Sequence, residues 1–66
     1  MLKAARLKAG LRQADVARKL AQPQSFVSKY ESGERQLDLL ELMQVCSALG
    51  LSLTNFVRAF EESVQR

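Results

Sequence analysis

The chain has 66 residues, with ten Lys and Arg against seven Asp and Glu, no His, no Trp and one Cys. This length allows one domain, and we expect residues 1–66 to form it. One Cys and no His exclude a disulfide within the chain and a cysteine metal cluster, so we expect no metal, cofactor or small-molecule substrate. No apolar run approaches the roughly 18 residues of a membrane span, and the charged start MLKAARLKAG is unlike a signal peptide, so we expect a cytoplasmic protein without a membrane partner.

The charge is divided unevenly along the chain. Residues 1–35 carry eight basic and three acidic side chains, a net charge of +5, whereas residues 36–66 carry two basic and four acidic ones, a net charge of −2. A basic half in so small a domain favours a polyanionic partner. Basic side chains that only solvate helix surfaces would give the same count, so the charge alone does not decide.

Hydrophobic spacing predicts an all-α fold, because no segment combines strict alternation with β-branched residues. We expect five short helices, at residues 2–9, 13–20, about 23–31, about 38–49 and from 53 onward. Asp38 and Ser52 are suited as N-caps of the last two helices, and Pro23 suits the first position of the third. Only Ala21 and Gln22 separate the second helix from the third, and so short a link predicts a helix-turn-helix.

Helical periodicity also predicts which side chains face the core. The expected inward residues are Leu2, Ala5 and Ala9; Val16, Ala17 and Leu20; Phe26, Val27 and Tyr30; Leu39, Leu42, Met43, Cys46 and Leu49; and Leu53 and Phe56. Cys46 is expected to be a small buried apolar residue, because neither a His nor a second Cys is present to activate it.

The run GLRQADVARKLAQPQSFVSKYESGER, with LMQVCSALGLSL downstream, resembles the phage-repressor-like (XRE-type) helix-turn-helix DNA-binding domains. The resemblance extends from Leu2 to about Val57 and implies the lambda-repressor-like fold, a compact bundle of five helices in which the second and third form the helix-turn-helix. Three positions depart from the family pattern. Ala21 replaces the usual Gly, Arg12 the usual Ser or Thr cap, and Ala5 a common Leu, so we expect an uncapped second helix and a thin core.

The resemblance implies double-stranded DNA as the partner, with the third helix in the major groove. The outer face of that helix offers side chains suited to base edges, namely Gln24, Ser25, Ser28 and Lys29: Gln suits adenine, Lys suits guanine and Ser suits either. Any surface helix has a polar face, so the prediction gains its weight from the five-helix frame.

We predict phosphate contacts from Arg12, Gln13 and Arg35, which flank the third helix. Gln13 begins the second helix, where free backbone N–H groups favour an anion, and the resemblance places its amide beside Gln24. Lys29 could contact either a base or a phosphate. The resemblance further implies a partly buried, structural ion pair between Arg6 and Glu31.

No nucleophile, metal set or phosphate-binding loop accompanies the remaining carboxylates, so we expect no enzyme and assign to helix surfaces Asp15, Glu34, Glu41, Glu61 and Glu62. The predicted function is operator binding as a transcriptional regulator, a repressor or autoregulator. The alternative is a helix-turn-helix that binds protein, such as the recognition half of an antitoxin or a bridging factor.

We also predict a two-fold homodimer. Val57, Phe60 and Val64 extend the apolar stripe of the fifth helix beyond the reach of the other helices, and Leu37 and Leu40 are expected to adjoin it. The alternative is that Phe60 and Val64 fold back onto the first helix and complete the core of one subunit.

Overall fold

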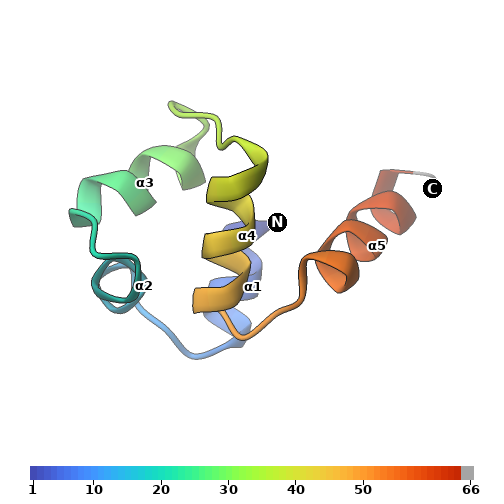
Figure 1. Ribbon diagram of the computed structural model, residues 1–66, viewed down its shortest axis with the longest axis horizontal. Helices are drawn as coiled ribbons and strands as arrows, with labels where there is room; N and C mark the ends of the chain where they lie inside the picture. Colours follow the sequence, from blue (N-terminus) through green and yellow to red (C-terminus); the bar gives the residue numbers. More distant parts are fainter. Residues whose placement is uncertain (65–66) are drawn as a thin grey trace.

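The computed structural model describes residues 1–64, which form five α-helices and no strand (Figure 1). The helices are α1 (Leu2–Lys8), α2 (Gln13–Leu20), α3 (Gln24–Ser32), α4 (Leu39–Ala48) and α5 (Leu53–Val64). The predicted all-α fold is confirmed, and each predicted helix boundary lies within one residue of the boundary in the structure. Helix length and order therefore follow from the hydrophobic periodicity of the sequence.

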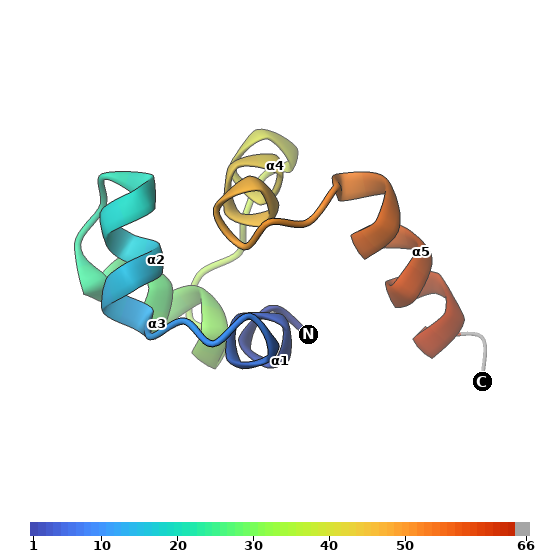
Figure 2. The same ribbon diagram turned by 90° about the horizontal axis from the view of Figure 1, so that it is seen from below.

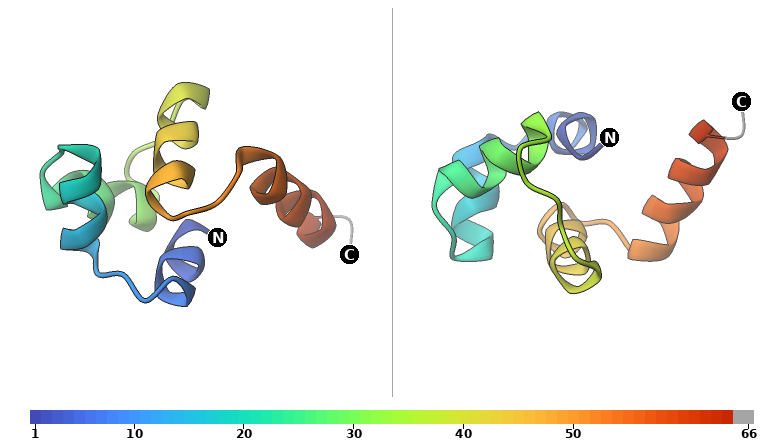
Figure 3. Two further views of the ribbon diagram at one scale, coloured as in Figure 1. Left: turned by 60° about the horizontal axis from the view of Figure 1, so that its bottom comes forward. Right: turned by 90° about the horizontal axis from the view of Figure 1, so that it is seen from above.

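α2 and α3 lie together at one end of the molecule, and α4 lies between them and α5 (Figures 1 and 2). α1 lies near the C-terminal end of α3, whereas the turn from α2 lies at the N-terminal end of α3 (Figure 2). α5 projects away from the other four helices in every view, which elongates the molecule to 34 × 23 × 20 Å (Figure 3). We refer to α1–α4 as the body.

The core lies between α2, α3 and α4. It contains six buried side chains that pack together: Val16, Ala17, Val27, Tyr30, Val45 and Leu49. Cys46 is also fully buried, as predicted. Leu2, Ala5, Leu11 and Leu37 pack on the edge of this cluster and connect α1 and the α3–α4 loop to it.

The predicted inward face of α4 is partly wrong. Leu39 and Met43 are 67% and 47% exposed, whereas Val45, which the spacing did not select, is 1% exposed. Apolar residues occupy almost every side of this helix, so periodicity does not single out one face and packing against α2 decides instead. Ala9, predicted to face inward, lies exposed beyond the end of α1.

Two of the predicted helix caps are confirmed. The Asp38 carboxylate accepts the backbone N–H of Glu41 at 2.7 Å, and the Glu41 carboxylate accepts the N–H of Asp38 at 3.1 Å, which is a capping box. The Ser52 hydroxyl accepts the N–H of Asn55 at 3.1 Å. These caps fix where α4 and α5 begin.

α5 does not complete the core as predicted. The helix contains no buried residue, and Leu53 and Phe56 are only half-buried. Its axis is bent from that of α4 by 104° at the short link that joins them. Within residues 1–64 no single helix is long and apolar enough to cross a membrane; only α4 and α5 taken as this bent pair reach the required length and composition.

Candidate nucleic-acid interface

The turn between α2 and α3 sets the angle of the two helices. α2 ends at Leu20, and its C-cap Ala21 has a left-handed φ of 55° and ψ of 41°. Gln22 donates its N–H to the carbonyl of Ala17 at 3.0 Å. Pro23 is the N-cap of α3 rather than its first helical residue, because its ψ of 153° is extended. Its carbonyl accepts the N–H of Phe26 at 3.0 Å. This tight turn leaves the outer surface of α3 uncovered.

α3 has one buried and one exposed face. Val27 and Tyr30 are buried and Phe26 is half-buried against the core. The four side chains predicted to contact bases are all exposed and recur at helical spacing on the other face; we call them the reading face: Gln24, Ser25, Ser28 and Lys29. A helix with such a face has the shape and the hydrogen-bonding groups that enter a major groove.

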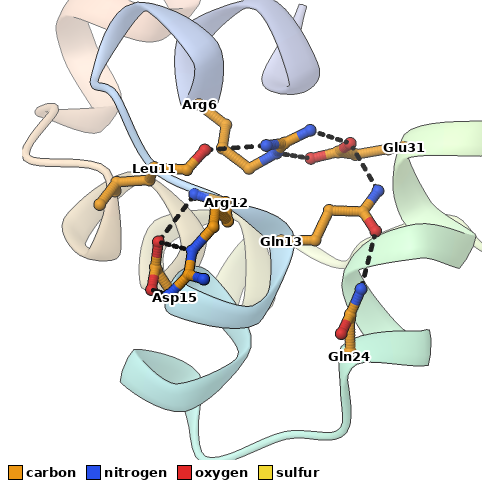
Figure 4. Close-up of polar contacts among 7 residues, drawn as sticks. All are labelled: Arg6, Leu11, Arg12, Gln13, Asp15, Gln24 and Glu31. Carbon is orange, nitrogen blue, oxygen red and sulfur yellow. Dashed lines mark hydrogen bonds and ion pairs between the residues drawn. The ribbon is translucent and has the colours of Figure 1, made fainter.

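Gln13 connects the reading face to the interior. Its Nε2 donates to Oε1 of Glu31 at 3.1 Å, and its Oε1 accepts from Nε2 of Gln24 at 3.4 Å (Figure 4). Gln13 is the first residue of α2, where the first backbone N–H groups of a helix have no partner within it. The structure thus brings together Gln13 and Gln24, as the family resemblance implies.

Arg6 and Glu31 form a bidentate ion pair that ties α1 to the end of α3. Arg6 Nε lies 2.7 Å from Glu31 Oε2, and Arg6 Nη2 lies 3.1 Å from Glu31 Oε1. Nη1 of Arg6 also donates to the carbonyl of Leu11 at 2.8 Å. The two side chains are only 8% and 4% exposed, so this pair is part of the interior.

The surroundings of Glu31 keep it ionised. Burial raises its pKa, but the hydrogen bonds from Arg6 and Gln13 outweigh burial and bring the pKa below its ordinary value. The positive charges of Arg6 and Lys3 act in the same direction. Glu31 is therefore a permanent hydrogen-bond acceptor in the folded protein near neutral pH.

Arg12 at the start of α2 is not a free cation. Its guanidinium makes two hydrogen bonds to Asp15, at 2.9 and 3.1 Å, and the Asp15 carboxylate also accepts the Arg12 backbone N–H at 2.9 Å (Figure 4). These bonds lower the pKa of Asp15 to about 2. Arg12 has no acceptor with which to cap the helix, as predicted, but Asp15 supplies half of a capping box from inside it. The Arg12 side chain remains 76% exposed, in reach of an anion.

Arg35 is held more firmly by protein partners than the sequence suggests. Its Nη2 lies 2.6 Å from Oε2 of Glu41, its guanidinium carbon lies 4.7 Å from the centre of the Phe26 ring, and the side chain is 38% exposed. The pair with Glu41 is not evident from the sequence, because the loop between α3 and α4 must fold before the two residues meet. A phosphate would have to compete with Glu41 for this side chain.

Three of the five predicted dimer residues lie on α5, at the far end of the molecule from α2 and α3 (Figure 1). Val57, Phe60 and Val64 are 37%, 49% and 66% exposed. Leu40 is also exposed, whereas Leu37 is half-buried against the core. The alternative expected Phe60 to complete the core of its own subunit. In the structure Phe60 is half exposed and lines an open groove instead.

That groove has a volume of about 360 Å³ and lies between α5 and the body. Leu2, Leu37, Leu42, Phe56 and Phe60 form its apolar lining, and Lys3, Glu31 and Arg35 add polar groups. Tyr30 also lines it, with a buried hydroxyl that has no hydrogen-bond partner among the described residues. Burial raises the pKa of this hydroxyl to about 12, so it stays neutral.

Comparison with known proteins identifies the class of this domain. The sequence profile of a helix-turn-helix family matches residues 2–56. Among solved structures, the chain is similar to an XRE-family like protein from Pseudomonas syringae pv. tomato str. DC3000, with a TM-score of 0.88 and 40% sequence identity over 94% of this chain and 76% of that chain. Comparison with curated protein sequences gives no match. The chain belongs to the XRE-type helix-turn-helix family, which is a family of DNA-binding regulators.

Proposed function

We propose that this protein binds an operator in double-stranded DNA sequence-specifically and acts as a transcriptional regulator, a repressor or autoregulator. The observation that carries the proposal is the reading face: four polar side chains exposed together on α3, backed by Gln13 at the start of α2. Gln24 is suited to adenine, Lys29 to guanine, and the two serines to either base. A domain bound over a promoter excludes other proteins from it, which suits repression.

The phosphate contacts are assigned to the N-terminus of α2, the exposed face of α3 and the loop that follows α3. The N-terminus of α2 offers backbone N–H groups and the positive end of its helix dipole, with Gln13 and Arg12 beside it. Lys29 lies on the exposed face of α3, and Arg35 follows that helix and reaches a phosphate by leaving Glu41. Contacts at separate points fix the register of the reading helix on the duplex.

The DNA-bound form is assigned as a two-fold homodimer. One domain reads only a few base pairs, which is too little to select a site among about 10⁶–10⁹ competitors. Two subunits related by a two-fold axis place their reading helices about 34–36 Å apart, one turn of DNA. The exposed apolar side chains of α5 supply the contact, here called the α5 stripe: Val57, Phe60 and Val64.

Charge supports a second copy as the partner of the α5 stripe. Glu61 and Glu62 lie exposed beside Phe60, whereas Lys3 and Arg35 line the groove between α5 and the body. A partner subunit's α5 would bring carboxylates toward Lys3 of this groove, whose other charged groups, Glu31 and Arg35, are paired within the chain, while it covers apolar surface. Leu37 and Leu40 belong to the same proposed contact.

Selection of bound sites from random DNA tests the proposal. The expected outcome is a two-fold symmetric sequence with half-sites one helical turn apart. Recovery of unselected sequences, or absence of duplex binding at low salt, would overturn it.

One observation favours the second candidate, a helix-turn-helix that binds protein. Leu39, Leu40 and Met43 form an exposed apolar patch on α4 in addition to the α5 stripe. If the random-DNA selection fails, a variant with Leu39→Glu and Met43→Glu that no longer binds a protein partner would establish this candidate instead.

A further inference from the structure

A continuous hydrogen-bonded chain runs from the interior of the protein to the reading face, through Glu31, Gln13 and Gln24. It begins at a carboxylate that is 4% exposed and ends at an exposed amide. We propose that Glu31 is a positioning residue for base readout, which acts through Gln13 to fix the direction in which the Gln24 amide faces the DNA. This inference rests on the proposed function, because it concerns how α3 distinguishes bases.

The first step is the orientation of Gln13. An ionised carboxylate only accepts hydrogen bonds, and Glu31 already accepts two from Arg6, at 2.7 and 3.1 Å. Gln13 therefore turns its amide nitrogen toward Glu31, with Nε2 at 3.1 Å from Oε1. The reversed amide would set two oxygen acceptors against each other with no proton between them, so this direction is excluded.

The second step transmits this direction to Gln24. With its nitrogen directed at Glu31, Gln13 presents its carbonyl oxygen to Gln24, and Gln24 turns its own nitrogen toward that oxygen, at 3.4 Å. One N–H and the carbonyl oxygen of Gln24 remain free, in a fixed order. A donor and an acceptor in fixed order match the N7 acceptor and the N6 donor of adenine.

The consequence is that the hydrogen-bonded chain disfavours the wrong bases as well as favouring the right one. A free Gln amide turns over at little cost, because its oxygen and nitrogen are similar in shape, and it then suits a different base edge. Holding the amide in one direction removes that second pattern, and exclusion of competitors is as effective a source of specificity as added contacts. Replacement of Glu31 by Gln lets both directions occur, since an amide at position 31 donates as well as accepts.

The test compares base preferences of three variants with those of the wild-type protein. Glu31→Gln removes the acceptor-only group. Arg6→Met combined with Glu31→Gln does the same without leaving the Arg6 charge unpaired, so that a folded protein is available. Arg6→Lys is the matched control, because it weakens the ion pair but leaves the carboxylate facing Gln13. Affinities are measured for the selected site and for its three single-base variants at the position that Gln24→Ala identifies, at a temperature where circular dichroism shows folded protein.

A bidentate contact discriminates against a wrong base by about 5- to 150-fold. In both variants that carry Glu31→Gln we expect this discrimination to fall by about threefold or more, chiefly through tighter binding of the disfavoured bases, with other positions unchanged. The lost negative charge changes affinity for all sequences alike and cancels in the ratio. Arg6→Lys should retain the discrimination.

Two results would overturn the inference in distinguishable ways. Unchanged discrimination in the double variant would show that Glu31 has only a structural role, while α3 still reads the base. If Gln24→Ala changes preference at no position, readout by α3 is itself wrong and the positioning role of Glu31 falls with it.

Discussion

In the body, apolar side chains from α2, α3 and α4 enclose one another, and a bidentate ion pair joins α1 to α3. In α5 the apolar side chains are as regularly spaced, but none is buried, and the helix projects away from the body (Figure 3). The two regions thus have the same kind of sequence pattern, but their apolar side chains are buried in the body and exposed or half-buried in α5.

The difference separates two tasks. The body encloses its apolar core within one chain and holds the reading face in place. α5 presents an amphipathic surface that one chain leaves uncovered, and this is the surface that the proposed dimer would cover. If this division is right, variants of the body change folding or DNA binding, whereas variants of α5 change assembly.

The largest expected effect is loss of the ion pair in the body. Arg6→Ala leaves the carboxylate of Glu31 buried without its counter-charge, at a cost of about 3–5 kcal/mol in the free energy of unfolding. Urea unfolding followed by circular dichroism measures it. Arg58→Ala, which removes an exposed cation from α5, should change stability by less than about 0.5 kcal/mol. A double-mutant cycle without coupling between Arg6 and Glu31 would contradict the structural role of the pair.

The second-largest expected effect is the salt dependence of DNA binding. If Arg12, Lys29 and Arg35 each neutralise one phosphate on both subunits, log K falls against log[salt] with a slope of about −5, or roughly 10³-fold in affinity between 50 and 200 mM salt. A slope near −3.6 would mean that Arg35 remains paired with Glu41 and contacts no phosphate, because only Arg12 and Lys29 then neutralise phosphates in each subunit. Fluorescence anisotropy on the selected duplex gives the slope, and a flat dependence would contradict phosphate binding.

Assembly through α5 is the next effect. Phe60→Glu introduces a charge into the α5 stripe and should weaken the dimer by about 2–4 kcal/mol, as a central interface aromatic does. Because Phe60 is 49% exposed in one subunit, the variant should remain folded. Sedimentation equilibrium at tens of micromolar measures the change, and Asn55→Glu, which adds the same charge at an exposed position on the side of α5 away from the stripe, is the control. A wild-type protein that is already monomeric there would sink the proposed dimer.

Base readout is a smaller effect. Gln24→Ala should cost roughly 1–3 kcal/mol on the selected site and relax the preference at one base position. Arg12→Ala, by contrast, should weaken binding to specific and random DNA alike, because phosphates carry no sequence information. Equal losses for Gln24→Ala on both kinds of DNA would contradict its assignment to the reading face.

Some features of the fold follow from the sequence alone, and others depend on packing between helices. Helix boundaries follow from the spacing of apolar residues and from caps such as Asp38 and Ser52, which are local signals. The inward face of α4 does not follow, because that helix is apolar on nearly all sides and only its contact with α2 selects Val45 over Met43.

The candidate site divides in the same way. The exposure of the reading face is implied by the burial of Val27 and Tyr30 on the other side of α3, so periodicity predicts it. The partners of Arg12 and Arg35 are not predicted, because Asp15 and Glu41 pair with them only through a helix start and a folded loop. The projection of α5 is not predicted either, because it depends on how α5 packs against the body, and the sequence of a single helix does not determine that.

The smallest effect concerns the turn that joins α2 to α3. Ala21 has a φ of 55°, a left-handed conformation that costs an L-residue about 1–2 kcal/mol, whereas Gly adopts it freely but loses about 0.5–1 kcal/mol in backbone entropy. Ala21→Gly should therefore stabilise the body by about 0.5–1 kcal/mol. Thermal unfolding at matched concentration measures the gain, and the dimer affinity should not change, since the turn is remote from α5. Gly33→Ala is the opposite control. Its φ of 86° is also left-handed and an added Cβ would meet nothing within 4 Å, so its loss of stability would report backbone conformation alone. If Ala21→Gly gave no gain while Gly33→Ala gave a loss, the turn of the body would already be relaxed around Ala21, and the departure from the family's Gly at this position would carry no cost.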